Sequence, residues 1–113
     1  MAAKKLSQPL LILTTVSSLS EARRLARGLL KRRLVGCVNV IPGIRSFYWW
    51  KGRVEQGKEL LLFLKTTRHR LPALSRFVKA AHSYDVPELV ALPFSWGHPL
   101  YLKWLRDSVE TVL

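Results

Sequence analysis

The chain has 113 residues, 49% of them hydrophobic, and a formal net charge of +12 at pH 7. That length predicts one domain, 1–113, whose core covers about 9–110. No apolar run is long enough to span a bilayer, the first residues are too polar for a signal peptide, and a single cysteine excludes an internal disulfide. We therefore expect a cytoplasmic protein with no membrane-spanning segment.

The first two predicted elements are a strand and a helix. Residues 10–13 form a short, continuous apolar run, which is typical of a strand buried on both faces. Ser18 and Glu21 have the spacing of a capping box, in which a serine hydroxyl and a glutamate carboxylate bond free backbone amides at a helix start. Apolar residues then recur at helical intervals as far as Leu30, with arginines opposite, so an amphipathic helix is expected.

A long β-hairpin is predicted over residues 36–66. Two β-prone apolar runs flank the turn Lys51-Gly52, and Pro42-Gly43 indicates a bend or bulge in the first arm. Residues 60–64 of the second arm again indicate a strand buried on both faces. The aromatic residues 48–50 near the tip are too apolar to leave in water, so the hairpin predicts a partner surface and hence an oligomer.

The last predicted elements are a helix, a strand and a helix. Apolar spacing predicts a helix over 71–81, in which Pro72 is tolerable only in the first turn. Prolines near both ends of 86–94 favour a strand at a sheet edge, and 101–109 predict a final helix. The order β-α-β-β-α-β plus a C-terminal helix is that of an α+β, ferredoxin-like split βαβ sandwich, with the first and third strands central.

Several motifs, in register over most of the chain, resemble those of the CutA family, also called divalent-cation tolerance proteins. The matching segments are Gly36-Cys37-Val38-Asn39, Ile41-Pro42-Gly43, Tyr48-Trp49-Trp50-Lys51-Gly52, Leu64-Lys65-Thr66, His82-Ser83-Tyr84-Asp85-Val86-Pro87-Glu88 and Tyr101-Leu102-Lys103-Trp104-Leu105. The resemblance implies a tight homotrimer whose sheets meet edge to edge. It also implies a part in tolerance of divalent metal ions, with copper(II) as the first candidate.

The resemblance further implies a cleft between subunits, near which Trp50, Glu59, Lys65, His82, Tyr84 and Glu88 are expected to lie. Of these, His82 and Glu88 are predicted metal ligands, because imidazole nitrogens and carboxylate oxygens bind copper and zinc. The alternative is that His82 caps the second helix and Glu88 bonds a neighbouring subunit. Cys37 is a third candidate ligand, although a cysteine between small and apolar neighbours is more often a core residue.

A different interpretation of the same cleft is a small-molecule site. A sensing or scaffold trimer, similar in fold to the PII signalling proteins, would hold an anionic metabolite there, because Lys65 at the end of a buried strand can act as a point charge. Enzymatic activity is not expected. The sequence contains no G-x-S-x-G, no Gly-rich phosphate loop, no H-E-x-x-H and no paired-cysteine zinc motif.

The positive charge is concentrated between Glu21 and Glu55, an interval without any acidic residue. Such a field attracts polyanions, and the aromatic residues 48–50 lie among basic side chains that suit stacking on nucleobases. We favour the simpler interpretations, which are a solvated helix face and aromatic anchors of a protein interface. On that basis, nucleic acid is not expected to be a partner.

Overall fold

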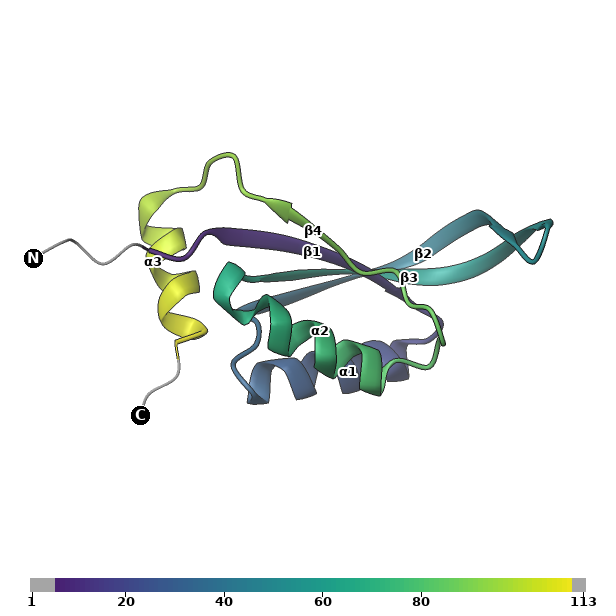
Figure 1. Ribbon diagram of the computed structural model, residues 1–113, viewed down its shortest axis with the longest axis horizontal. Helices are drawn as coiled ribbons and strands as arrows, with labels where there is room; N and C mark the ends of the chain where they lie inside the picture. Colours follow the sequence, from purple (N-terminus) through teal and green to yellow (C-terminus); the bar gives the residue numbers. More distant parts are fainter. Residues whose placement is uncertain (1–5, 111–113) are drawn as a thin grey trace, which may run out of the picture.

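Both long helices lie on one face of a four-stranded antiparallel sheet (Figure 1). The computed structural model describes residues 6–110. The strands are β1 (Pro9–Val16), β2 (Cys37–Trp50), β3 (Arg53–Thr67) and β4 (Val90–Pro93). The helices are α1 (Leu19–Lys31), α2 (Leu71–Ala81) and α3 (Pro99–Ser108), and a 3-10 turn, η1 (Arg68–Arg70), leads into α2. Among the described residues, no helix combines the length and apolar character needed to cross a membrane.

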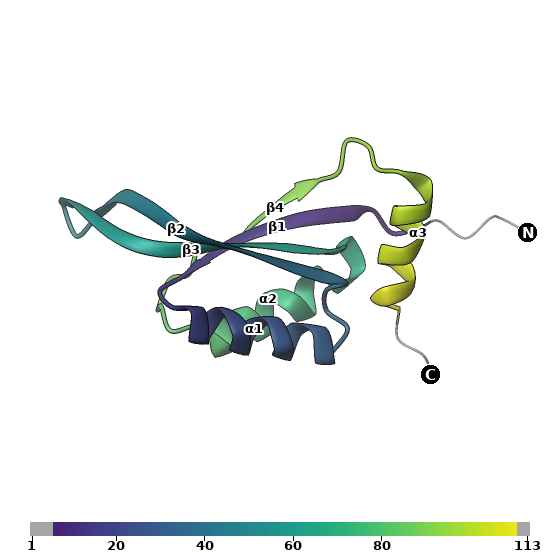
Figure 2. The ribbon, with the colours of Figure 1, turned by 180° about the vertical axis from the view of Figure 1, so that it is seen from behind.

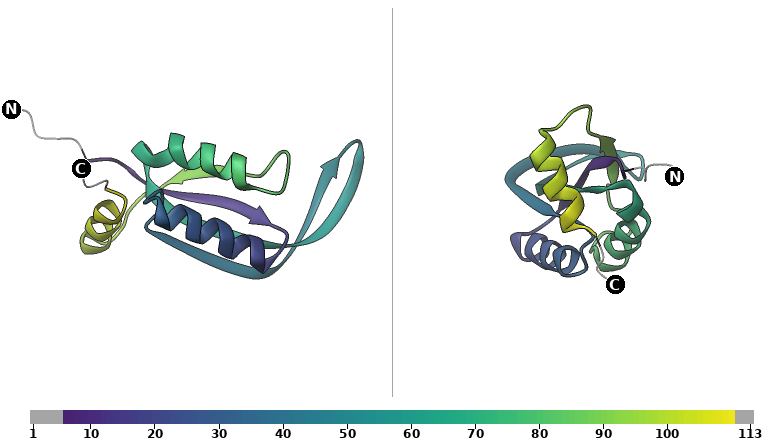
Figure 3. Two further views of the ribbon diagram at one scale, coloured as in Figure 1. Left: turned by 90° about the horizontal axis from the view of Figure 1, so that it is seen from below. Right: turned by 90° about the vertical axis from the view of Figure 1, so that its left-hand side faces the viewer.

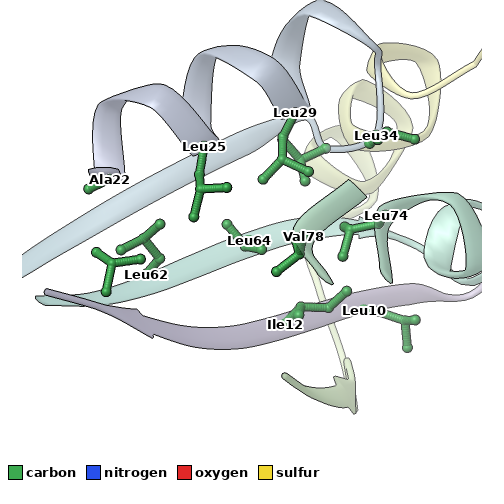
Figure 4. Close-up of a cluster of buried hydrophobic side chains, with 12 residues drawn as sticks. Leu10, Ile12, Ala22, Leu25, Leu29, Leu34, Leu62, Leu64, Leu74 and Val78 are labelled. Atoms are coloured by element: carbon green, nitrogen blue, oxygen red, sulfur yellow. The ribbon is translucent and has the colours of Figure 1, made fainter. Parts of the chain in front are cut away.

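The strand order is β2-β3-β1-β4, which confirms the predicted split βαβ arrangement with β1 and β3 in the centre. Leu10 and Ile12 of β1 alternate with their neighbours and face the helices, as do Leu62 and Leu64 of β3. All four side chains are fully buried against α1 and α2 (Figure 4). Burying a leucine in this way contributes about 1.5–3 kcal/mol, so this face holds the core.

The other face of the sheet carries a second apolar set. Leu11 and Leu13 of β1 lie beside Leu61 and Phe63 of β3, and all four are only partly buried. Within the described chain, the long helices leave this face uncovered, and only α3 packs at one end of the sheet (Figures 1 and 2). We call Leu11, Leu13, Leu61 and Phe63 the open face.

The β2–β3 hairpin projects well beyond the helices (Figure 3). Lys51 and Gly52 both have positive φ, at 51° and 78°, which gives the predicted tight turn. The predicted bulge is also present, as a register shift between Ile41 and Ile44. The projecting arms give a radius of gyration of 15.5 Å, above the value of about 13 Å for a compact domain of this size. Trp49 near the tip is 75% exposed.

Two local predictions need correction. The last strand is shorter than expected, since β4 starts at Val90 and the chain before it forms a loop. Pro87 lies in that loop and has no amide hydrogen for a sheet ladder. Only half of the capping box forms. The Ser18 hydroxyl accepts a hydrogen bond from the Glu21 amide at 3.1 Å, but the Glu21 carboxylate bonds elsewhere.

Candidate functional site

A pocket of about 600 Å³ lies between the β2–β3 hairpin and the loop that joins α2 to β4. We call it the hairpin pocket, and its lining residues are Thr15, Ser46, Phe47, Tyr48, Trp50, Glu59, Tyr84, Asp85, Val86 and Glu88. Four of the residues predicted to lie near a cleft therefore come together. The pocket combines aromatic side chains with carboxylates, and Asp85 was not among the predicted site residues.

The alternation of the hairpin strands explains much of this lining. After the bulge, Ser46, Tyr48 and Trp50 point to the same face of β2, because every second residue of a strand does so. Glu59 of β3 pairs with Ile44, so its side chain emerges on that face too. The loop after α2 then brings its own polar residues to the opposite wall of the pocket.

Tyr84 joins the two walls. Its hydroxyl donates a hydrogen bond of 2.8 Å to the Glu59 carboxylate. Burial raises the pKa of Tyr84, and the bond to the negative Glu59 raises it further, so the phenol stays protonated well above its ordinary range. The bond fixes one oxygen of Glu59 and holds the loop against the hairpin.

His82 is the C-cap residue of α2, as the alternative interpretation predicted, and its ring is buried. Ring nitrogen Nδ1 accepts a hydrogen bond of 3.0 Å from the Tyr84 amide, so Nε2 carries the proton and donates to the Thr15 carbonyl at 2.8 Å. Coordination of a metal by His82 would therefore require one of these bonds to break. In this arrangement the ring positions Tyr84, whose own ring lies 4.7 Å away between centroids.

Glu21, which the sequence interpretation treated only as a helix cap, fastens the same loop. Its carboxylate accepts hydrogen bonds from the Ser83 amide at 2.8 Å and the Ser83 hydroxyl at 2.9 Å. Burial by itself raises the pKa of Glu21, but the hydrogen bonds from Ser83 outweigh this effect and lower the pKa below its ordinary value, with a smaller electrostatic contribution from the His82 ring. The sequence did offer one sign of this role, because Glu21 is the single acidic residue of an otherwise basic helix.

Lys65 and Cys37 lie apart from the hairpin pocket. They are paired with each other across β3 and β2, and Lys65 also pairs with Leu11. Thr15, at the pocket, is four residues further along β1, a distance of about 13 Å. The Lys65 ammonium instead lies 5.9 Å from the ring centroid of Tyr101 on α3. The predicted cleft set is therefore divided within one protomer.

The pocket does not by itself form a closed metal site. Within residues 6–110, no three histidine, cysteine, aspartate or glutamate side chains are close enough to hold an ion together. Glu59, Asp85 and Glu88 line one pocket without converging on one point. Within the described chain, the pocket therefore presents carboxylate oxygens but no complete set of ligands for a metal ion.

Comparison with known proteins gives consistent matches. The family profile described as "CutA1 divalent ion tolerance protein" matches residues 10–108. The divalent-cation tolerance protein CutA of Thermus thermophilus is 50% identical over 97 residues, which cover 86% of this chain and 94% of that protein. The crystal structure of CutA1 from Oryza sativa superposes with a TM-score of 0.90 at 41% identity, covering 95% of this chain and 98% of that one.

Relatives differ in length and in location. The chain spans only 57% of the chloroplastic CutA 1 protein of Oryza sativa, to which it is 44% identical over 89% of its own length. A CutA from Archaeoglobus fulgidus that is described as periplasmic has a TM-score of 0.87 at 38% identity, covering 90% of this chain and 99% of that one. Relatives with a similar domain therefore include longer chains, and they are described from different cell compartments.

Proposed function

Because the chain belongs to the CutA1 divalent ion tolerance family, we propose that it is a homotrimer that binds divalent cations, copper(II) first, at the hairpin pocket. It acts in metal-ion tolerance in the cytoplasm and is not an enzyme. One observation carries this proposal: three carboxylates line a single pocket in a chain that has only 7 acidic residues and a net charge of +12. Such a local reversal of sign attracts cations.

Copper(II) is the first candidate because of the general order of metal affinities. For a given set of oxygen and nitrogen donors, copper(II) binds more tightly than the other first-row divalent ions. Of the ligands predicted from the sequence, Glu88 lines the pocket, and Glu59 and Asp85 join it. His82 contributes by holding Tyr84, and becomes a ligand only if it gives up a hydrogen bond. Cys37 is proposed as a ligand only by way of a neighbouring subunit.

The trimer is supported by the apolar surface that one chain leaves uncovered. The open face is one part of this surface, and the hairpin tip is another, with Phe47 68% exposed and Trp49 75% exposed. Contiguous apolar surface of this kind marks an interface. The long edge strand β2 also needs a partner, since an unpaired edge invites association. A second subunit at the pocket would supply the donors that one protomer lacks.

The alternative, a sensing or scaffold trimer that binds an anionic metabolite, is less well supported. The hairpin pocket contains carboxylates that repel an anion, and Lys65 lies outside it. A positively charged side chain to bind such an anion would have to come from a neighbouring subunit. The cation-binding proposal needs only further donors of the kind that the pocket already has.

Calorimetric titration with copper(II) and zinc(II) at neutral pH tests the proposal. We expect Glu59→Gln/Glu88→Gln to weaken copper binding by about tenfold or more, since each substitution removes a negative donor while keeping its shape. The matched control, Glu55→Gln/Glu110→Gln, removes the same charge from exposed positions outside the pocket and should keep the wild-type isotherm.

A third variant separates the two predicted kinds of ligand. His82→Ala should keep copper binding within a few-fold if the carboxylates are the donors. Loss of binding in His82→Ala, with an unchanged isotherm in the double glutamate variant, would reject the pocket and make the histidine the ligand. Circular dichroism and sedimentation of each variant would verify that it remains folded and assembled.

A further inference from the structure

The outer surface of the helix layer is strongly basic. Seen from the helix side, α1 and α2 lie side by side along the sheet (Figure 3, left). The exposed cationic side chains of this layer, which we call the helix face, are Arg23, Arg24, Arg27, Lys31, Arg32, Arg33, Arg68, Arg76 and Lys79. The one carboxylate among residues 17–36 and 68–81 is Glu21, which is 5% exposed and bonded to Ser83. No exposed negative charge therefore interrupts the helix face in these segments.

Several of these cations are available to an outside partner. Five of them are held by the fold. Arg24, Arg32 and Arg33 donate to backbone carbonyls, and so does Lys79, whereas Arg68 donates to the Gln8 side chain. Within residues 6–110, no hydrogen bond or ion pair engages Arg27, Lys31 or Arg76.

The available cations also stand in an ordered row. Arg23, Arg27 and Lys31 follow one another at intervals of four residues, which places them along one stripe of α1. Near the start of α1, Arg23, Arg24 and Arg27 line a shallow hollow with Leu19 and Ser20. The positive end of the helix dipole adds to the field there.

We propose that the helix face binds the phosphate backbone of double-stranded nucleic acid without reading its sequence. A duplex carries one phosphate per about 1.7 Å of its axis, which complements a continuous field of cations. The 13 residues of α1 extend over about 20 Å, more than the major groove of about 12 Å. Cations at the two ends of α1 can therefore reach phosphates on both sides of a groove.

The composition of the helix face favours a duplex over two other polyanionic surfaces. Single strands are held by aromatic side chains that stack on bases, and the one aromatic residue of α1 and α2, Phe77, is half-buried beneath the Arg32 guanidinium at 4.5 Å. Membrane-surface helices turn an apolar side toward lipid. The apolar side of α1, with Leu25 and Leu29, is already buried against the sheet.

The helix face makes nucleic acid a candidate partner, although the sequence by itself predicted none. The folded chain adds α2 and η1 cations to those of α1 and buries the intervening carboxylate. The helix face also lies opposite the open face, so assembly through the open face leaves it accessible (Figure 1). It shares no residue with the hairpin pocket, so the proposal does not depend on metal binding.

Fluorescence anisotropy of a labelled duplex of about 20 base pairs, titrated from about 50 to 200 mM salt, tests this proposal. The test variant is Arg27→Gln/Lys31→Gln/Arg76→Gln. The matched control is Arg45→Gln/Lys51→Gln/Arg53→Gln, which removes the same charge from exposed positions on the hairpin. We expect the test variant to bind about tenfold or more weakly than wild type at 100 mM salt and to reduce the salt slope by about 2.7, from three lost phosphate contacts. The control should stay close to wild type in both.

Four results would overturn the proposal. The first is no duplex binding at about 100 mM salt. The second is an equal loss in both triple variants, which would indicate a diffuse effect of net charge. The third is tighter binding of the single strand than of the duplex. The fourth is binding to anionic phosphatidylserine vesicles in the absence of duplex binding, which would make the partner a membrane.

Discussion

The two faces of the sheet come from the same central strands but are completed in different ways. Leu64 of β3 is fully buried by α1 and α2, whereas its neighbour Phe63 lies on the open face and is only partly buried. The helix-covered face is therefore a core that one chain completes. The open face and the hairpin beside it keep apolar side chains exposed or only partly buried within the described chain, and the proposed trimer would bury them against another chain.

Charge follows a similar division. The helix side exposes arginines and lysines and buries Glu21, whereas Glu59, Asp85 and Glu88 gather at the hairpin pocket. The apolar side of α1 and α2 is already buried against the sheet, so their outer side can face solvent or a polyanion. The pocket, in contrast, is formed where loop and hairpin leave the core, and within residues 6–110 it contains no group of three potential metal ligands close enough to hold an ion.

The largest expected effect comes from a charge placed on the open face. Phe63→Asp should convert the assembled protein to monomer at about 10 µM, because an unpaired charge buried at an interface costs about 3–5 kcal/mol per subunit. Sedimentation velocity would measure this. Leu30→Asp, which adds the same charge on the exposed side of α1, should remain assembled. An unchanged sedimentation coefficient for Phe63→Asp would contradict the assignment of the open face.

The neighbouring residue tests the other face. Leu64→Ala should lower the free energy of unfolding by about 2–5 kcal/mol, because it leaves a cavity in a fully packed core. Urea unfolding of the variant should show the loss. The same substitution at Leu30, which is 44% exposed, should cost less than about 1 kcal/mol. Equal losses at the two positions would mean that the helices do not form the main core.

Glu21 connects the helix layer to the pocket loop and gives a pH-dependent prediction. Because its folded-state pKa is lowered, its stabilisation is present above its ordinary value of 4.5 and is lost as the pH falls through the lowered pKa. Glu21→Gln should cost about 1–2 kcal/mol at neutral pH, and the difference from wild type should shrink below about pH 4.5.

Unfolding curves from about pH 3 to 7 would measure this change. Glu55→Gln, at an exposed position of β3, is the control and should show a small difference from wild type throughout. A stability difference for Glu21→Gln that does not change with pH would reject the role given to the carboxylate.

Tyr84 gives the smallest predicted effect on stability. Tyr84→Phe removes the bond to Glu59 and should cost about 1 kcal/mol, whereas Tyr101→Phe on α3 should be nearly neutral. The absorbance of tyrosinate offers a second measurement, because burial and the Glu59 carboxylate keep Tyr84 protonated above the ordinary pKa of 10.0. The part of the tyrosinate absorbance that appears only above the ordinary pKa should be absent in Tyr84→Phe. If that absorbance remains in the variant, another tyrosine is responsible for it.

The periodicity of the sequence was enough to predict the fold. Continuous apolar runs marked the two central strands, and Lys51-Gly52 marked the hairpin turn, because these signals are local. Trp50, Glu59, Tyr84 and Glu88 line one pocket of this chain, while their place in a cleft between subunits stays a prediction of the family resemblance.

The separation of Lys65 from the pocket depends on strand register, which no spacing in the sequence revealed. The bonds of His82 were also beyond prediction, since its partners are a backbone carbonyl on β1 and a backbone amide in the loop. Side-chain contacts with distant backbone groups leave no pattern in the residues themselves.

Native mass spectrometry of the protein titrated with copper(II) would test assembly and metal binding together, because one spectrum reports both. We expect a species of three times the 13.0 kDa chain mass that takes up one copper ion per hairpin pocket, with an empty trimer for Glu59→Gln/Glu88→Gln. A copper-free trimer would reject the metal site alone. A monomer at micromolar concentration would contradict the conclusion that a second chain completes the open face.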